Sequence, residues 1–211
     1  MIGVGELADA FVFQLLSDLV QVDAGFIQVI HDCQVFSDVV VDHHLCAGVV
    51  QEGFRETFGS DADHLQEPVD VDRTVAAGFT MFTIDPGEHV DDEADDADAP
   101  ALAHRLDELD AEPLEASADD LRKRYVGRTF PLEGGGEVSF DAETFLRAAA
   151  KYGGAVAHTV QMHRRLREQR DEGEFELEVS VDETETPTSP AEHYFFAAEL
   201  KRLGVEWVSM A

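Results

Sequence analysis

The sequence predicts an α/β fold, which we interpret as a partial TIM-like (β/α) barrel truncated at the C-terminus. Two observations lead to this class. Apolar strand patterns alternate with helical patterns along residues 49–211, which is typical of a parallel sheet covered by helices. A complete barrel needs about 250 residues, whereas residues 49–211 are far fewer and end within an apolar strand pattern.

Residues 1–48 form an atypical N-terminal segment. The first basic residue of the chain is Arg55, although a solvated helix or strand usually carries some lysine or arginine. Both cysteines, Cys33 and Cys46, also lie in this segment. Two interpretations stay open: a diverged extra element, or a start foreign to the ancestral protein, such as a shifted reading frame. We favour the second.

The organised part of the chain begins with strands. A short strand is expected near 49–52, and the nearly all-apolar segment 78–84 (GFTMFTI) predicts a buried strand that stops at an Asp-Pro-Gly turn signal. Residues 91–120 are rich in Asp, Glu and Ala. We expect them to form a solvated acidic excursion, with a short helix at about 101–109.

The second half contains a long helical pattern that runs from Asp141 to about residue 170. Asp141 is a good N-cap, and the Gly153-Gly154 pair is expected to kink or loosen the helix. Before it, Gly134-Gly135-Gly136 lacks the lysine of a phosphate loop and favours a hairpin. The remaining pattern is a strand at 175–182, a helix at 190–203 and a strand at 205–210.

Composition excludes several classes of partner. The 211 residues include 45 acidic and 15 basic side chains, a formal net charge of −30, and 44% are hydrophobic. Nucleic acid and anionic membranes would be repelled by this charge. Acid spread along the whole chain is typical of proteins that work in molar salt, where charges are strongly screened. This acidity predicts a halophilic protein. Two cysteines are too few for a disulfide framework and no apolar stretch is long enough to span a membrane, so we expect a cytoplasmic location.

Glu178 is the first candidate catalytic residue. Because side chains alternate along a strand, Glu178 lies on the polar face and Leu177 and Val179 lie on the apolar one. In a barrel the polar face looks inward, where a carboxylate is desolvated and suited to proton transfer. An edge strand with one wet face explains the same alternation.

The string Asp61-Ala62-Asp63-His64 follows the strand expected near 49–52. A histidine beside two carboxylates can bind a divalent metal, with a carboxylate as ligand or base. Capping of a helix by Asp61 or Asp63 is the plainer alternative. Asp85, at the end of its strand, is a third candidate because active-site residues collect at that end of barrel strands; simple turn chemistry competes with this interpretation.

Three strings together resemble the tagaturonate epimerase family of hexuronate metabolism: QEGFRETFGSDADH at 51–64, GFTMFTIDPGEHV at 78–90 and FELEVSVDETETPTSP at 175–190. GVEWVSMA at 204–211 is similar to the strand that follows in that family. The likeness covers about residues 48–211 in the family's order. Residues 1–48 do not look like the family, whose members are considerably longer.

The resemblance implies a metal-dependent enzyme that interconverts D-tagaturonate and D-fructuronate by inverting C4. It implies Asp63 as proton acceptor, Glu178 as proton donor and His64 as a ligand of a divalent cation, with further histidine ligands beyond Ala211. The C4 hydrogen is not acidified by the C2 carbonyl, so we expect retro-aldol cleavage and re-formation of the C3–C4 bond. Two alternatives stay open: another metal-dependent aldolase or sugar isomerase, and a non-catalytic fragment.

Overall fold

The computed structural model describes residues 61–171, 173–181 and 184–211. Contacts divide the chain into two compact units, and of the described residues only Thr74–Phe79 belong to the first. These residues include the end of helix α4 (Pro68–Ala77). The second unit carries the sheet and the candidate site. Residues 1–48 and the strand expected near 49–52 lie outside the described residues.

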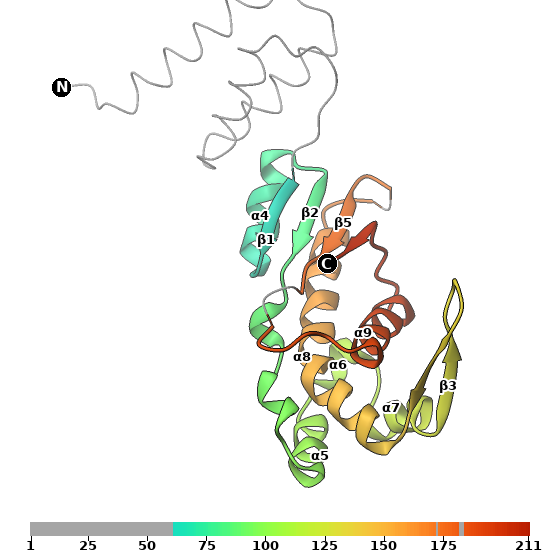
Figure 1. Cartoon of the computed structure of the whole chain (residues 1–211). Helices are drawn as coiled ribbons and strands as arrows, with labels where there is room; N and C mark the ends of the chain where they lie inside the picture. The colour runs from blue at the N-terminus through green and yellow to red at the C-terminus, as the bar shows by residue number, and fades with distance from the viewer. Residues whose placement is uncertain (1–60, 172, 182–183) are drawn as a thin grey trace, which may run out of the picture. The chain divides into compact units, whose positions relative to one another are not determined.

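Four parallel strands form a sheet in the order β1-β2-β5-β6 (Figure 1). Their bounds are Asp61–Leu65 for β1, Met81–Ile84 for β2, Glu176–Val179 for β5 and Ser209–Met210 for β6. The predicted α/β class with a parallel sheet is therefore confirmed. The strands do not close on themselves within the described residues, so the barrel stays a prediction.

Burial separates the two faces of the sheet. Phe82 of β2 pairs in register with Leu177 of β5, and both side chains are buried. Phe175, just before β5, contacts Phe82 edge to face, and its ring centroid lies 6.2 Å from that of His163. Because His163 belongs to helix α8 (Ala142–Arg167), the apolar face packs against this helix, as side-chain alternation predicts.

The connection between β2 and α8 differs from the solvated excursion expected at 91–120. It folds into short helical elements: η1 (Gly87–His89), η2 (Asp92–Asp95), α5 (Ala99–Asp107), α6 (Ala111–Leu114) and α7 (Ala118–Tyr125). Leu102, Leu106, Leu114 and Leu121 of these helices are at most 1% exposed. The acidic residues cap and flank the helices while the leucines supply the packing face, so acidity here does not mean solvation of the whole segment.

Helix α8 begins after Asp141, whose Oδ1 accepts a hydrogen bond from the backbone N–H of Thr144 at 2.8 Å, as predicted. The Gly153-Gly154 pair does not interrupt the helix. A Cβ at Gly153 would lie 2.3 Å from Leu109 Cδ1, and a Cβ at Gly154 would lie 2.7 Å from the backbone oxygen of His89. The pair therefore admits close neighbours rather than a kink.

A hairpin and helix α9 complete the described fold. Strands β3 (Arg128–Pro131) and β4 (Glu137–Phe140) pair antiparallel, and Gly134, Gly135 and Gly136 between them have positive φ, which confirms the predicted hairpin. Helix α9 (Pro190–Arg202) begins with a capping box formed by its N-cap and third residue.

An aromatic cluster joins these parts. The ring of Tyr125 in α7 lies 5.1 Å from Phe140, 5.9 Å from Phe145 and 5.2 Å from Phe195, measured between centroids. The cluster therefore ties α7, the hairpin, α8 and α9 together. None of the described helices is both long and apolar enough to cross a membrane.

Candidate active site

Carboxylates gather on the polar face of the sheet, opposite α8. Thr83 of β2 pairs in register with Glu178 of β5, and its Oγ1 donates a hydrogen bond of 2.8 Å to Asp61 Oδ2. Asp61 interacts electrostatically with Asp63, Glu178 and His64. Asp63 and His64 of β1 and Glu178 of β5 therefore lie on the two strands that flank β2.

The backbone of β1 is irregular at His64. The register with β2 shifts between Ala62 and Leu65, and His64 has a φ of 54°, in the left-handed region that residues other than glycine seldom adopt. The His64 side chain is 50% exposed, with Nδ1 3.3 Å from Asp85 Oδ2 and Nε2 3.7 Å from Asp63 Oδ2. Backbone strain of this kind is concentrated at functional sites.

Asp85 does more than close a turn. It is 6% exposed, and its Oδ1 accepts a hydrogen bond of 2.9 Å from the Gly87 N–H, as turn chemistry predicts. Its Oδ2 accepts a further bond of 2.8 Å from Gln66 Nε2 and faces His64. Burial alone would raise the pKa of Asp85, but the hydrogen bonds from Gln66, Gly87 and His64 outweigh it and lower the pKa. An ionised Asp85 therefore orients the His64 ring.

Two alternatives from the sequence are wrong. Strand β5 lies between β2 and β6, so Glu178 does not belong to an edge strand, and its side chain is half-buried. Asp61 and Asp63 lie within β1, so neither caps a helix. The roles of Asp63, His64 and Glu178 stay predictions, because their positions alone do not test them.

The grouping of like charges changes the chemistry of Asp61. Desolvation raises the pKa of Asp61; the hydrogen bond from Thr83 opposes this change, and the charges of Asp63 and Glu178 raise the pKa further. A carboxyl group that keeps its proton more readily than usual is suited to exchange protons with its neighbours. Asp61 is therefore a candidate for holding a proton at this face.

Two stacked histidines, His158 and His89, lie near Gln66 and Asp85, which follow strands β1 and β2. His158 of α8 is 7% exposed and stacks on His89 of η1 with ring centroids 3.9 Å apart. Its ring hydrogen-bonds to the backbone of Gln66 and interacts with the charge of Asp85. Burial, with a smaller contribution from His89, lowers the pKa of His158 to about 4. His158 is therefore neutral at neutral pH and packs as a core residue.

The described residues do not complete a metal centre. Among them, no group of three or more His, Cys, Asp or Glu side chains is arranged to hold a metal ion. His64 and Asp63 offer partly exposed nitrogen and oxygen donors, yet protein metal sites generally need three or more ligands. The residues described here do not fit a complete divalent-metal site on their own.

Two members of the site escape sequence reasoning. Thr83 had an available signal, since it is a polar residue inside an otherwise apolar strand pattern. Asp61 was considered both as a carboxylate beside His64 and as a helix cap, but its bond to Thr83, 22 residues away in the chain, was not predicted. Gln66 carries no recognisable pattern, and only the fold brings it to Asp85.

Comparisons with known proteins agree on one family. The sequence profile of the tagaturonate epimerase family (UxaE) matches residues 32–211. The tagaturonate/fructuronate epimerase of Thermotoga maritima is 40% identical over 170 residues, which cover 78% of this chain and 32% of the relative. The chain thus spans about a third of the length of this relative.

Solved structures give the same result. Three crystal structures of the fructuronate-tagaturonate epimerase UxaE from Cohnella laeviribosi, one native and two with glycerol, match with TM-scores of 0.62 to 0.67. Their sequences are 30% to 32% identical to this chain, and the match covers 78% of this chain and 32% of theirs. The described sheet and helices therefore correspond to one part of a longer fold.

Proposed function

Because this chain belongs to the tagaturonate epimerase family, we propose that it takes part in the interconversion of D-tagaturonate and D-fructuronate, a C4 epimerisation in hexuronate catabolism. The observation that carries the proposal is the grouping of Asp61, Asp63, His64 and Glu178 at the polar face of the sheet. His64 and Glu178 lie near the carboxyl ends of their strands, where β/α enzymes keep their active sites, and Asp61 and Asp63 lie earlier in β1.

The chemistry of the substrate favours cleavage between carbons. C4 lies β to the C2 carbonyl, so its hydrogen is not acidic. Removal of the C4 hydroxyl proton allows the C3–C4 bond to break, with the bonding electrons moving toward the C2 carbonyl and an aldehyde forming at C4. Rotation of the aldehyde followed by re-formation of the bond inverts C4 and leaves an alkoxide that needs a proton.

Two carboxyl groups perform the proton transfers. Asp63 accepts the proton of the C4 hydroxyl, and Glu178 donates a proton to the new C4 alkoxide. Each turnover therefore leaves Asp63 with one proton more and Glu178 with one fewer. We infer that Asp61, whose pKa is raised in part by the charges of both, returns the proton between them.

The proposal includes a divalent cation with His64 as one ligand, and a barrel in which the four described strands form one part of the wall. A cation of this kind would stabilise negative charge on the C2 oxygen of the substrate. No step above depends on it, because the described residues do not complete its site. Further histidine ligands are expected beyond Ala211.

The working environment proposed is a saline cytoplasm. The net charge of −30 supports it, since screening in molar salt removes most of the repulsion among surface carboxylates. We expect the midpoint temperature of thermal unfolding to rise steadily as KCl is increased toward about 2 M, where the Debye length falls below about 3 Å.

The reaction is tested by following D-tagaturonate in D₂O with NMR. We expect D-fructuronate to form with the original hydrogen retained at C4, because the C4–H bond never breaks in the proposed scheme. Deuterium at C4 would show direct proton abstraction from carbon instead. Parallel assays with simple ketoses separate this function from that of another aldolase or sugar isomerase on the same scaffold.

A non-catalytic fragment is the second candidate. It is motivated by the incomplete metal centre among the described residues. Titration of Zn²⁺ or Mn²⁺ into the chain and into its His64→Ala variant distinguishes the two. Absence of both turnover and saturable, His64-dependent binding would favour the fragment.

A further inference from the structure

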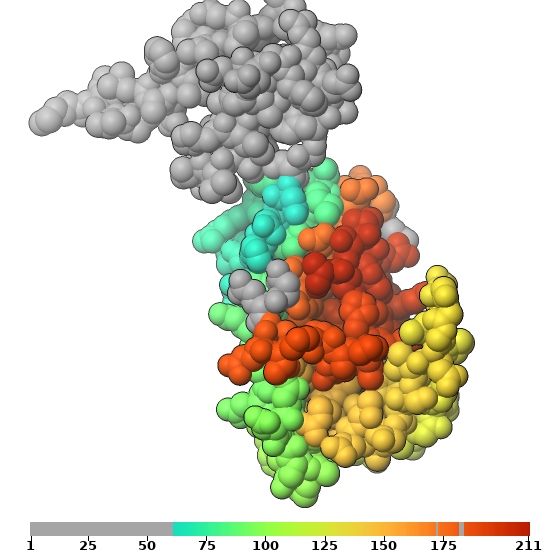
Figure 2. All heavy atoms as spheres, viewed as in Figure 1, coloured from blue at the N-terminus to red at the C-terminus, as the bar shows by residue number. Residues whose placement is uncertain are grey.

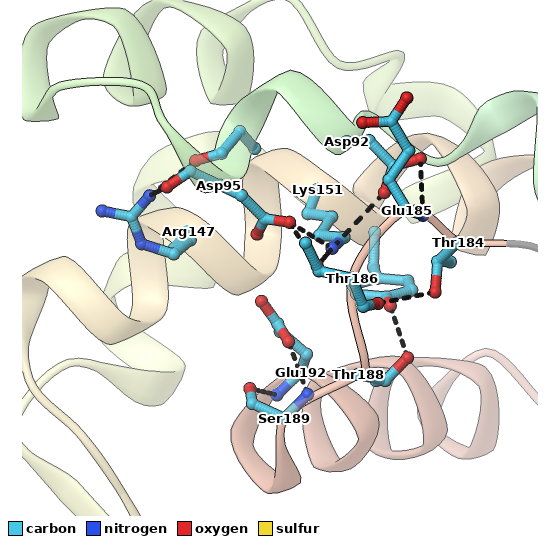
Figure 3. Close-up of polar contacts among 12 residues, drawn as sticks. Asp92, Asp95, Arg147, Lys151, Thr184, Glu185, Thr186, Thr188, Ser189 and Glu192 are labelled. Carbon is cyan, nitrogen blue, oxygen red and sulfur yellow. Dashed lines mark hydrogen bonds and ion pairs between the residues drawn. The ribbon is translucent and has the colours of Figure 1, made fainter.

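A buried ammonium group lies where segments from different parts of the chain meet. Lys151 of α8 is 0% exposed. Its Nζ lies 2.7 Å from Asp95 Oδ2, 2.8 Å from Thr186 Oγ1 and 3.4 Å from Asp92 Oδ1 (Figure 3). Of the three N–H donors of the ammonium group, two make hydrogen bonds, to Asp95 and Thr186, and Asp92 lies within ion-pair distance.

The neighbours of Lys151 come from the two segments that follow β2 and β5. Asp92 and Asp95 belong to η2, which follows β2, and Thr186 belongs to residues 184–188, which follow β5. Because the strands are parallel, both segments start at the same edge of the sheet. Figure 2 shows the orange segment after β5 lying on the surface beside the green segment that contains η2.

Other contacts hold residues 184–188 in the same place. Tyr152 of α8 shares a hydrogen bond of 2.7 Å with Thr188 Oγ1, and the backbone N–H of Glu185 donates to Asp92 Oδ2 at 3.4 Å. The Thr186 hydroxyl also donates to Asp95, so Lys151, Thr186 and Asp95 form a closed triangle of hydrogen bonds. Lys151 is the cation at the centre of this network.

The charge state of Lys151 decides what it can do. Burial would lower its pKa, but the hydrogen bond to Asp95 and the neighbouring charges outweigh burial and raise the pKa. A retro-aldol enzyme that works through a Schiff base needs a neutral lysine amine. Lys151 is an ammonium ion held by two hydrogen bonds and two nearby carboxylates, and it is therefore suited to hold a structure together rather than to attack a carbonyl.

We propose that Lys151 is a positioning residue whose ammonium group fixes residues 184–188 against η2, and so orders the edge of the sheet at which Glu178 and Asp85 lie. The effect on turnover rests on the proposed function. The order of residues 184–188 does not, so the two can be tested separately.

Hydrogen exchange of the full chain, read by mass spectrometry, tests the proposal with Lys151→Met, which keeps an unbranched apolar side chain, one atom shorter, and removes the ammonium group. We expect peptides covering 184–189 to exchange about tenfold faster or more, while peptides covering 195–202 keep their protection. The matched control is Glu199→Gln, a fully buried charged residue of α9 outside this network. It should loosen 195–202 and leave 184–189 unchanged.

Unchanged exchange at 184–189 in Lys151→Met would overturn the proposal, as would the same increase in both variants, because that pattern indicates general destabilisation. Thr186→Val removes the partner on the loop and keeps the buried amine, so it serves where Lys151→Met does not fold. Thr186→Val should raise the exchange rate of peptides covering 184–189. In the double variant this rate should exceed that of Lys151→Met by less than twofold. Additive effects would contradict a direct link between the two residues.

Turnover gives an independent comparison. If the wild-type chain epimerises D-tagaturonate, Thr186→Val should lower kcat by more than it changes KM, since it disturbs the edge that holds the acid–base groups. A change in KM alone would contradict the positioning role. A wild type without turnover would count against the proposed function and leave the exchange result standing.

Discussion

Buried and half-exposed carboxylates have opposite surroundings in this protein. Glu199 of α9 is 0% exposed and accepts hydrogen bonds from Arg124, from the Tyr125 hydroxyl at 2.7 Å and from Arg202 at 2.7 Å. Asp61 accepts its bond from the neutral hydroxyl of Thr83, and its other neighbours include two more carboxylates.

The difference separates charges that support the fold from charges that are available to a ligand. A buried carboxylate surrounded by cations has little left to offer a substrate, and its loss leaves those cations unpaired. Carboxylates grouped without such compensation oppose folding, so their presence on one face is better explained by chemistry. The predictions below test this separation, from the largest expected effect to the smallest.

Turnover should depend on the polar face and hardly at all on Glu199. Loss of a general acid or base typically costs 10² to 10⁴ in rate, so Asp63→Asn and Glu178→Gln should each lower kcat by roughly 10³. Glu199→Gln should keep kcat within about threefold, a change of under about 1 kcal/mol in activation free energy. Steady-state assays on folded variants measure the effect, and an equal loss in all three variants would erase the distinction.

The free energy of unfolding should depend strongly on Glu199 and hardly at all on Asp63. Removing one partner of a buried ion pair typically costs about 3–5 kcal/mol, so Glu199→Ala should lower the free energy of unfolding by about that amount. Asp63→Asn should leave it nearly unchanged or raise it slightly, since it removes one of several like charges from an exposed position. Urea denaturation in concentrated KCl compares them; a strongly destabilised Asp63→Asn would mean that the polar face also supports the fold.

The neutral His158 should make the fold sensitive to acid. Its pKa is about 4 in the folded chain against an ordinary 6.5, so between these values the unfolded chain binds a proton that the folded chain does not. Stability should therefore fall as pH drops from 6.5 to 4, by roughly 3 kcal/mol at most from this residue.

The measurement is the pH dependence of urea denaturation in His158→Gln. This variant should lose the contribution of His158 to the slope between pH 6.5 and 4, whereas the exposed His104→Gln should keep the wild-type slope. His89 stacks on the same ring and Asp85 interacts with its charge, so the comparison uses differences between variants rather than the wild-type curve alone. Equal slopes in the two variants would refute the assignment.

The smallest expected loss of stability comes from replacing the serine N-caps of helices α9 and α7. Ser189 caps α9 at the end of the segment that Lys151 holds, accepting a bond from the Glu192 N–H at 3.3 Å while its own N–H donates to Glu192 at 2.7 Å. Ser189→Ala should cost about 1 kcal/mol. Ser117→Ala, at the capping box of α7, should cost a similar amount, because both helices begin in the same way. A much larger loss at Ser189 alone would show that the cap also supports the segment before it.

Local chemistry made much of the fold predictable. Asp141 and the Pro190 start of α9 identify helix starts, and the apolar run around Phe82 and the apolar–polar alternation around Leu177 identify strands of the sheet. The strand parity that placed Glu178 on the polar face is also a local property. The assignment of residues 1–48 stays a prediction, and the family match begins at residue 32.

Contacts between residues far apart in the chain could not be predicted from the sequence. The acidic composition of 91–120 concealed leucines that pack inward, and nothing local distinguishes Lys151 from a solvated lysine. The site was predictable where chemistry follows strand ends, as for Asp85, and unpredictable where partners are far apart, as for Asp61 with Thr83.

The Gly153-Gly154 pair shows that helix propensity alone does not predict which substitutions a helix tolerates. Alanine is the best helix former and glycine among the poorest, by about 1 kcal/mol per residue, so an engineer seeking heat resistance would replace both. In α8 a methyl added at Gly154 would lie 2.7 Å from the backbone oxygen of His89, whereas a methyl added at Gly153 would meet only the flexible end of the Leu109 side chain. Random libraries should therefore tolerate few replacements at Gly154 and more at Gly153.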